Sequence, residues 1–497
     1  MFRSKIKSLF IASAIFLTAC QLTVHDADNH PVVITSASAF ALDTEVVNPP
    51  NADEVDSILN NKNKTSSMFR NKTKTNIRVG VLAPFSGDNK SLGLAVKNTA
   101  TMALYETPSD NVTLQFYDTK GTVSGAVAAI KEAIEQGVDI VVGPVFSYEV
   151  KAIADIARSA NVDVLALTSD PNVLEQGIYT LALLLPQQVD RIISFACAQG
   201  KSNFAVIAPD SESGRMMANA AIASAYKCEN AQVSKIAFFS NEQGNMVNIV
   251  KEIVGERTEY VDALRRQSKK EGEYAENYKK PEPIEGEEEK IDILEKYTSS
   301  EEIPLDFDAI LIAEEGSNLR SIAATLNYYD VTSNEAQFLG TQAWANSSIA
   351  KESSLLGGWY VAILNDGFRD FSKRYKKIYG ANPPRIVSQV YDGVSLAATL
   401  ANRRNFSAAA ITDPSGFAGV DGIFRIFYDG SSERGMAVIQ IERNKTSVID
   451  QAPVTFANFP IVEEIIVPEE ENKKDFTINI FTEESIEEDH TDEIFSD

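Results

Sequence analysis

Short apolar runs alternate with longer amphipathic stretches along most of the chain after residue 75. The first run, NIRVGVLAPFSG at 76–87, is followed by LGLAVKNTATMALYE at 92–106, whose apolar residues recur at helical spacing. The alternation continues through VDIVVGP at 138–144 and VDVLALTSDP at 162–171. Buried strands separated by amphipathic helices predict stacked βαβ units, with a parallel sheet that is covered on both faces.

A second series of the same kind begins at the end of IYTLALLLP, residues 178–186. It includes the strand-like runs NFAVIAP at 203–209 and DAILIAEEG at 308–316, with helical segments between them. Two α/β series in succession predict two lobes. A ligand site is then expected in the cleft between the lobes, at the carboxyl ends of the strands.

Three segments depart from this alternation. Residues 20–75 lack a sustained period and are interpreted as a flexible tether. Residues 251–302 are dense in charge, with a proline-containing break at 279–286, and predict a helical insertion in the second lobe. This insertion is either a set of solvated helices or an arm that docks a partner.

The C-terminal segment 463–497 carries 14 acidic and 2 basic residues. Its net charge of −12 is half of the −24 of the whole chain. Such a block rarely folds alone, so we expect a disordered, solvated tail that is dispensable for folding. A charged contact with a basic partner is the alternative.

The N-terminus has the pattern of a secretory signal peptide, residues 1–19. Basic residues precede an apolar run from Leu9 to Leu17, and this run has about half of the roughly 20 residues that a membrane-spanning helix needs. The sequence Leu17-Thr18-Ala19-Cys20 resembles the bacterial lipobox, which implies that Cys20 is lipidated and anchors the protein to a membrane. The alternative is an ordinary signal peptide cut nearby. Gln21 favours the outer membrane, by resemblance to the enteric sorting rule.

Composition narrows the classes of function. The 497 residues, 44% of them hydrophobic, provide material for two or three domains with a sizeable core. A net charge of −24 and a pI near 4.7 argue against nucleic acid as a partner and against electrostatic docking on anionic lipid.

Histidine usage argues against most enzyme chemistry. The only histidines are His25, His30 and His490, and all three lie outside the two expected lobes. Serine or cysteine nucleophiles that depend on imidazole, and most zinc sites, are therefore excluded there. No Walker-type phosphate loop is present either. We predict no catalytic residues, no metal and no cofactor, although catalysis by carboxylates alone stays open.

Two cysteines remain after the anchor, Cys197 and Cys228, each near the end of an expected helix. An even pair in an exported protein predicts a disulfide. Closing a loop of about 30 residues would stabilise the fold by roughly 3–4 kcal/mol in the chain-entropy model. Two independent buried thiols are the alternative.

Several motifs resemble a known family. RVGVLAPFSGDNKSLGLAVKN, VVGPVFSYEVKAIADIARSANVDVLALTSDP and YDGVSLAATLA are similar to type I periplasmic solute-binding proteins of the branched-chain amino-acid class. FDAILIAEEGSNLRSIAATLNYYDV, FLGTQAWAN, GGWYVA and GFAGVDGIFRIFYDGSSERGMAVIQIE resemble the penicillin-binding protein activators, an LpoA-like lipoprotein branch. The resemblance covers about residues 76–458. It implies a two-lobed α/β fold in which the chain crosses between lobes three times.

The resemblance also implies the limits of the lobes. The first lobe would comprise 76–184 and 350–412. The second would comprise 185–349 and 413–458.

In amino-acid binders of this fold, hydroxyls and backbone amides of the first lobe hold the ligand carboxylate. The resemblance places Ser147 and Thr168 or Ser169 in that role, with Ser86 as a further cleft candidate. Alternatively, Ser147 caps the helix that follows it, and the Thr-Ser-Asp-Pro segment forms a turn.

The second lobe of such binders supplies an acid for the ligand ammonium group, and here the matching residue is Gln342, with Trp344 close by. A glutamine cannot form the charge-assisted pair that recognises an ammonium. Glu314 or Glu315 would compensate, unless these residues only open a helix.

The sequence therefore favours a membrane-anchored periplasmic lipoprotein that regulates a penicillin-binding protein without chemistry of its own. The alternative is the receptor of an ABC importer for amino acids or another small polar ligand in the cleft.

Overall fold

The computed structural model describes residues 76–456, apart from 108, 110, 241–244, 277–302, 347 and 365, together with residues 23–25, 31–33 and 479–481. The chain divides into two compact units, Met1–Met68 and Phe69–Asp497. In the first unit, β1 (Thr23–His25) pairs antiparallel with β2 (Pro31–Val33). The signal segment, Cys20 and the rest of the expected tether lie outside the described residues.

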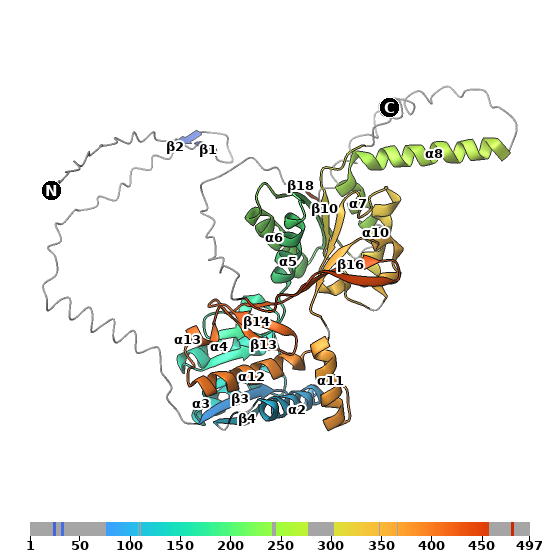
Figure 1. Ribbon diagram of the computed structural model, residues 1–497. Helices are drawn as coiled ribbons and strands as arrows, with labels where there is room; N and C mark the ends of the chain where they lie inside the picture. The colour runs from blue at the N-terminus through green and yellow to red at the C-terminus, as the bar shows by residue number, and fades with distance from the viewer. Residues whose placement is uncertain are drawn as a thin grey trace, which may run out of the picture. The chain divides into compact units, whose positions relative to one another are not determined.

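The first lobe is built on a five-stranded parallel sheet in the order β4-β3-β5-β6-β7. Its strands are β3 (Ile77–Ala83), β4 (Val112–Asp118), β5 (Ile140–Val142), β6 (Asp163–Ala166) and β7 (Ile178–Thr180). One face packs against α2 (Lys90–Glu106) and α12 (Val387–Arg403), and the other against α3 (Val123–Glu135) and α4 (Ser147–Ser159). Because helices cover both faces of the sheet, most side chains of these strands are buried, and their sequences are continuous apolar runs (Figure 1).

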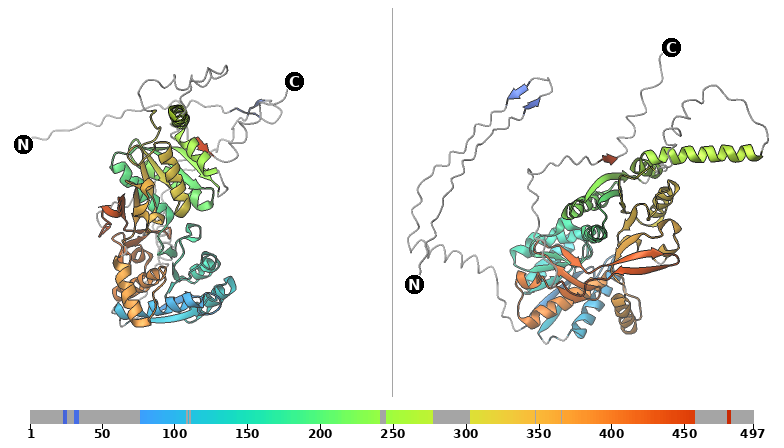
Figure 2. Two further views of the ribbon diagram at one scale, coloured as in Figure 1. Left: turned by 90° about the vertical axis from the view of Figure 1, so that its right-hand side faces the viewer. Right: turned by 45° about the horizontal axis from the view of Figure 1, so that its top comes forward.

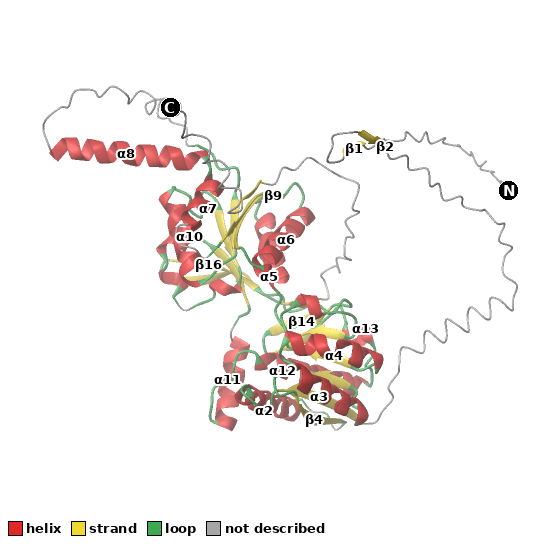
Figure 3. Cartoon of the chain, turned by 180° about the vertical axis from the view of Figure 1, so that it is seen from behind, coloured by secondary structure: helices red, strands yellow, loops and turns green. Residues whose placement is uncertain are grey.

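The second lobe has an eight-stranded mixed sheet in the order β17-β16-β12-β11-β10-β8-β9-β18. Its strands are β8 (Asn203–Pro209), β9 (Gln232–Phe239), β10 (Ala309–Ile312), β11 (Gln337–Gly340), β12 (Trp359–Ala362), β16 (Ala437–Glu442), β17 (Lys445–Asp450) and β18 (Asn479–Phe481). Strand β16 runs antiparallel to both of its neighbours, β12 and β17, and the other neighbouring strands of this sheet are parallel. Helices α5 (Leu185–Ala198) and α6 (Glu212–Lys227) cover one face, and α7 (Asn245–Val254) and α10 (Gly316–Tyr328) cover the other (Figure 3). The predicted two-lobed α/β fold is confirmed.

A small antiparallel sheet joins the first lobe: β13 (Phe417–Gly419), β14 (Gly422–Ile426) and β15 (Ser432–Arg434). Its residues Val420, Phe424 and Ile426 are buried in the same core as α2 and α12. The helices α11 (Asp366–Tyr379) and α13 (Ala408–Ile411) contribute to this core too. The remaining short elements are the 3₁₀ turns η1 (Pro171–Val173), η2 (Gln342–Trp344), η3 (Ile349–Lys351) and η4 (Ser353–Leu355).

These pairings correct two of the expected lobe limits. We placed 350–412 in the first lobe, but β12 pairs with β11 and β16 in the second sheet, so the chain changes lobe only after Ala362. We placed 413–458 in the second lobe, but β13–β15 bury their apolar side chains in the first core. The second sheet resumes at Ala437. In both places strand pairing keeps the chain in its lobe past the expected limit.

Arg434 connects two of the three crossings to the first lobe. Its Nε and Nη2 donate to the Leu181 carbonyl oxygen at 2.9 and 2.6 Å, and its Nη1 lies 3.0 Å from Oδ2 of Asp392 on α12. The Ser432 hydroxyl donates to the Ala182 carbonyl oxygen at 2.8 Å. The side chains of Arg434 and Asp392 are essentially inaccessible to solvent. Hydrogen bonds from Arg434 and Ser432 therefore hold the outgoing segment after β7 to the returning strand β15, and a buried ion pair fixes Arg434 to α12.

Asp392 has little other compensation. Its Oδ1 accepts the Val420 N–H at 2.7 Å. Burial raises the pKa of Asp392, the Arg434 guanidinium opposes that rise, and the nearby Asp421 carboxylate adds to it. Asp421 has its own partners, Arg385 at 2.6 Å and the Ser388 hydroxyl at 2.7 Å. Arg434 is thus the cation that offsets part of the cost of burying the Asp392 carboxylate.

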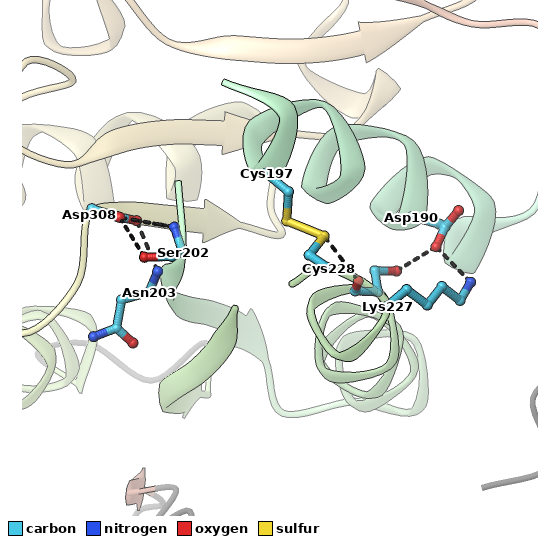
Figure 4. Close-up of a disulfide and its surroundings, with 8 residues drawn as sticks. Asp190, Cys197, Ser202, Asn203, Lys227, Cys228 and Asp308 are labelled. Carbon is cyan, nitrogen blue, oxygen red and sulfur yellow. Dashed lines mark hydrogen bonds and ion pairs between the residues drawn. A yellow bond between two sulfur atoms is a disulfide. The ribbon is translucent and has the colours of Figure 1, made fainter. Parts of the chain in front are cut away.

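The predicted disulfide between Cys197 and Cys228 is present and joins the ends of α5 and α6 (Figure 4). The two residues are 31 positions apart, with Cα atoms separated by 6.3 Å. Asp190 ties the same helices together, because its Oδ1 accepts from the Ser224 hydroxyl at 2.8 Å and from Lys227 Nζ at 2.9 Å. The face of the second sheet that α5 and α6 cover is therefore cross-linked along its helices.

The described part of the charged insertion is helical, as expected. Helix α8 (Glu256–Glu276) follows α7 after a break at Gly255, whose φ is +68° (Figure 2). Arg257, which is 7% exposed, fixes its base: Nε donates to the Ile303 carbonyl oxygen at 2.9 Å, and Nη1 lies 2.8 Å from Oε2 of Glu335. Residues 277–302 lie outside the described residues. Arg257 thus joins the start of α8, where the chain leaves the lobe, to Ile303, where the chain returns to it.

We expect Arg434→Met to lower the free energy of unfolding by about 3–5 kcal/mol, because it leaves Asp392 buried without its cation. The double variant Arg434→Met/Asp392→Asn should recover part of that loss, since asparagine accepts the Val420 N–H without carrying charge. Urea denaturation at pH 7 measures both. A single variant as stable as the native protein would show that the ion pair does not hold the crossings.

Candidate functional site

The carboxyl ends of the first-lobe strands carry the hydroxyl residues expected to bind a ligand. Ser86, after β3, is exposed and bonded to Asp118 at the end of β4: its N–H and hydroxyl donate to the two carboxylate oxygens at 3.1 and 2.5 Å. Burial by itself would raise the pKa of Asp118, but hydrogen bonds from Ser86 and from the N–H groups of Lys120 and Phe85 outweigh it and lower the pKa. Ser86 therefore ties two loops of its own lobe together.

Ser147 is half-buried as the first residue of α4. The N-cap of this helix is Phe146, which makes no side-chain capping bond, so the alternative that Ser147 caps the helix is wrong. Aromatic side chains surround this turn. The Tyr148 hydroxyl donates to the Gly121 carbonyl oxygen at 2.9 Å, and its ring stacks on Phe146 with centroids 5.4 Å apart. The first turn of α4 is thereby strapped to the loop after β4.

Glu149, in the same turn, is a fully buried carboxyl group. Neither of its oxygens makes a hydrogen bond of normal geometry to a described residue. Burial raises the pKa of Glu149, and the Thr119 hydroxyl and the N–H groups of Phe146 and Val145 oppose that rise only in part. The first turn of α4 therefore contains a buried acid two residues after Ser147.

Thr168 and Ser169 follow β6 and differ in their surroundings. The Thr168 hydroxyl accepts the Asp170 N–H at 3.1 Å, and its carbonyl oxygen accepts the Thr180 hydroxyl at 2.5 Å. Asp170 in turn accepts the Asn172 N–H at 3.0 Å. For Thr168, which is only 6% exposed, the turn alternative is confirmed. Ser169 is exposed and is the freer of the two hydroxyls.

Gln342, in the position of the ligand-binding acid, is occupied by backbone contacts. Its Oε1 accepts the Ile363 N–H at 3.0 Å, just after β12, where the chain crosses back to the first lobe. Its own N–H donates to Oε1 of Gln188 on α5 at 3.0 Å. Gln342 therefore joins the end of β11 to α5, which follows the first crossing, and to the segment after β12, which precedes the second crossing. The described structure gives this amide a structural role.

Trp344 is completely buried, which corrects its assignment as a ligand-binding candidate. Its Nε1 donates to the Glu314 carbonyl oxygen at 3.1 Å. A Cβ atom added at Gly340 would lie 2.2 Å from the indole ring, so the ring packs directly on the glycine backbone. Trp344 belongs to the core of the second lobe, where it also approaches Tyr360.

Glu314 is half-buried, and its Oε1 accepts the Glu315 N–H at 2.9 Å. Glu315 is the N-cap residue of α10. The alternative that these acids open a helix matches their positions.

Of the second-lobe candidates named from the sequence, the structure brings Trp344 and Glu314 together through the bond from the indole Nε1 to the Glu314 carbonyl oxygen. Sequence reasoning missed Glu149 and Tyr148. The signal for both was the aromatic and acidic pair directly after Ser147 in the sequence Phe-Ser-Tyr-Glu.

A shallow surface groove of about 520 Å³ lies elsewhere, between α3 and α4 of the first lobe. It is lined by Lys131, Ile134, Glu135, Asp155, Ile156, Ser159 and Ala160. None of the predicted cleft residues lines it.

Comparison with known proteins agrees with this architecture. The periplasmic binding protein family matches residues 76–446. No curated protein sequence matches the chain. A putative branched-chain amino acid ABC transporter structure from Rhodospirillum rubrum is similar, with a TM-score of 0.54, 14% identity, and coverage of 75% of this chain and 100% of that one.

Two structures of LpoA from Haemophilus influenzae are also similar. The C-domain of LpoA (YraM), described as a regulator of PBP1A, has a TM-score of 0.51 and 16% identity, and covers 75% of this chain and 99% of its own. Full-length LpoA has a TM-score of 0.51 and 17% identity over 76% of this chain. This chain spans 59% of that protein's length. At these identities the likeness is one of fold.

If Gln342 is structural, Gln342→Leu should lower the free energy of unfolding by about 1–3 kcal/mol, because it leaves the buried Ile363 N–H without an acceptor. Gln342→Glu keeps an acceptor oxygen at the same position and is the matched control, with a smaller loss. Chemical denaturation compares the two. Equal stability of the leucine variant and the native protein would contradict this role.

Glu149→Gln should stabilise the protein at pH 7. An acid whose pKa is raised on folding destabilises the native state as pH rises above its unfolded value of 4.5, and the penalty is absent below that value. The gain should therefore be present at pH 7 and vanish near pH 4, as measured by denaturation at both values. Glu135→Gln, at an exposed position of α3, is the control and should show no such pH dependence. A loss of stability that is the same at both pH values would contradict the assignment.

Proposed function

The chain belongs to the periplasmic binding protein family, and from that premise we propose that it is a regulator in the cell envelope. It binds a peptidoglycan-synthesising penicillin-binding protein and stimulates it through protein contacts. The lobes serve as a platform for this partner, and the protein carries out no chemistry of its own. The similar proteins are binding proteins or regulators, which supports a binding role.

The observation that carries the proposal is the contact between Gln342 and Ile363. A receptor for amino acids needs an anionic group in the second lobe to pair with the ligand ammonium. Here the matching side chain is neutral, and its oxygen already accepts a backbone N–H. Loss of one charge-assisted hydrogen bond forfeits roughly 1.5–3 kcal/mol, or about a tenfold to hundredfold drop in affinity.

The first lobe supports the same conclusion. The buried carboxyl group of Glu149 lies at the helix turn where a ligand carboxylate would bind. Tyr148 covers that turn by its bond to Gly121. The Thr168 hydroxyl is already engaged in a turn. Both ends of a zwitterionic amino acid would thus meet groups that carry no complementary charge or are already hydrogen-bonded within the protein.

The place of action follows from the N-terminus. We infer that Cys20 is lipidated and holds the protein at the periplasmic face of a membrane, with the outer membrane favoured by Gln21. In the part of the chain that the structure describes, no helix combines the length and the apolar character needed to cross a membrane. A lipidated Cys20, followed by the tether to residue 75, would let the lobes reach a partner in the cell wall.

A solute receptor is the second candidate. It is favoured by the exposed hydroxyl of Ser169 and the half-buried Ser147, which remain at the strand ends of the first lobe. The ligand would then be a small polar molecule that does not need an acid in the second lobe. Such a receptor would deliver its ligand to an ABC importer.

The two candidates are separated by binding measurements on the mature protein. Calorimetry with the twenty amino acids should show no binding of micromolar strength, and Gln342→Glu should not create any. A purified bifunctional penicillin-binding protein from the same cells should bind the mature chain and polymerise glycan strands faster in its presence. Micromolar binding of an amino acid, without any effect on the synthase, would establish the receptor instead.

A further inference from the structure

Strand β9 has the composition of an internal strand but lies next to the edge of the second sheet. Val233, Ile236 and Phe238 pack into the core beneath α6, and Ala237 and Phe239 pack into the opposite core beneath α7. One side of β9 pairs with β8 along its full length. Its other side would be an open, apolar edge if nothing further paired with it.

Open edges of this kind invite pairing with other chains, and proteins usually protect them with outward charges, prolines or short strands. The only charged residue of β9 is Lys235. It is 7% exposed, and its Nζ donates to the Ile253 carbonyl oxygen at 3.0 Å and pairs with Asp306 at 2.8 Å. Lys235 is thus held against its own lobe, and the edge needs another form of protection.

That protection comes from the acidic C-terminal tail. Strand β18 pairs parallel with β9 in the register Asn479↔Lys235, Ile480↔Ile236 and Phe481↔Ala237. It reaches this position after 22 residues, 457–478, a length that spans roughly 70 Å when extended and so does not limit where it docks. The tail was expected to be solvated, and these three residues depart from that expectation.

The tail sequence contains a strand signal where this pairing occurs. FTINIF, residues 476–481, has no charged residue and is rich in β-branched and aromatic side chains. Acidic clusters flank it, with Glu469–Glu471 before it and Glu483–Glu484 after it. Uncharged strand residues within a strongly acidic segment are typical of a peptide that pairs at one defined place and remains soluble elsewhere.

We propose that β18 is an intramolecular ligand of the second lobe, which adds a strand to the open edge of β9. Three paired residues make a weak contact, because the net gain of each hydrogen bond is about 0.5–1.5 kcal/mol and ordering the backbone opposes it. The covalent link raises the effective concentration of the strand near the lobe without any additional contact. The strand is therefore present without a large interface and remains displaceable.

The test is hydrogen exchange of the β9 amides in the full mature chain and in two variants. One variant ends after Val462. The other, Asn479→Pro/Ile480→Pro, keeps the tail but cannot form the strand: successive N–H groups point to opposite sides, so adjacent prolines remove the donor that faces β9. Ser485→Pro/Ile486→Pro places the same two prolines outside the strand and is the matched control.

We expect the β9 amides that face β18 to exchange about tenfold faster or more in both variants, and at the native rate in the control. Amides of β10, in the middle of the same sheet, should keep their rates in all three, which shows that the lobe stays folded. Unchanged exchange in β9 after both the truncation and the double proline substitution would overturn the proposal. Faster exchange in β9 and β10 together would overturn it too, since the tail would then stabilise the whole lobe rather than cover one edge.

Discussion

The buried ion pair between Arg434 and Asp392 fixes the side chain at which two of the three crossings meet. Three separate crossings give the chain many ways to pair its strands incorrectly near the junction. Arg434 removes that freedom, because its guanidinium contacts the Leu181 carbonyl oxygen from one crossing while its own strand forms another. Such a pair adds little net stability when the cost of removing two charges from water is included. Its value lies in specifying one arrangement.

A residue at a position expected to bind a ligand, Gln342, is likewise engaged in hydrogen bonds within the protein. The Gln342 side chain accepts the Ile363 N–H just before the second crossing. The Gln342 N–H donates to the side chain of Gln188 on α5. The second-lobe amide at the expected ligand position is thus engaged within its own lobe, next to the segments that lead to and from the first lobe.

Much of the fold followed from the sequence because each strand and helix has a strong local signal. The apolar runs from β3 to β11, the helices between them and the cysteine pair all have the periodicity or context that defines them. The lobe limits near 350 and 413 could not be predicted, because GGWYVA and GFAGVDGIFRIF are apolar strands that either core could accept. The burial of Trp344 and the backbone contact of Gln342 could not be predicted either. Trp344 packs on the nearby Gly340, but it also bonds to Glu314, and Gln342 bonds to Ile363, and both of these partners are distant in sequence.

The packing of Trp344 on Gly340 has a consequence for how this protein can change over evolutionary time. With the indole ring 2.2 Å from where a Cβ atom would be, any larger residue at 340 requires a smaller one at 344. The smaller residue would also leave the Glu314 carbonyl oxygen without its donor. Neither position can drift alone without passing through a less stable intermediate, so the two should vary together among relatives. Gly340 and Trp344, four residues apart, are therefore expected to change as a pair.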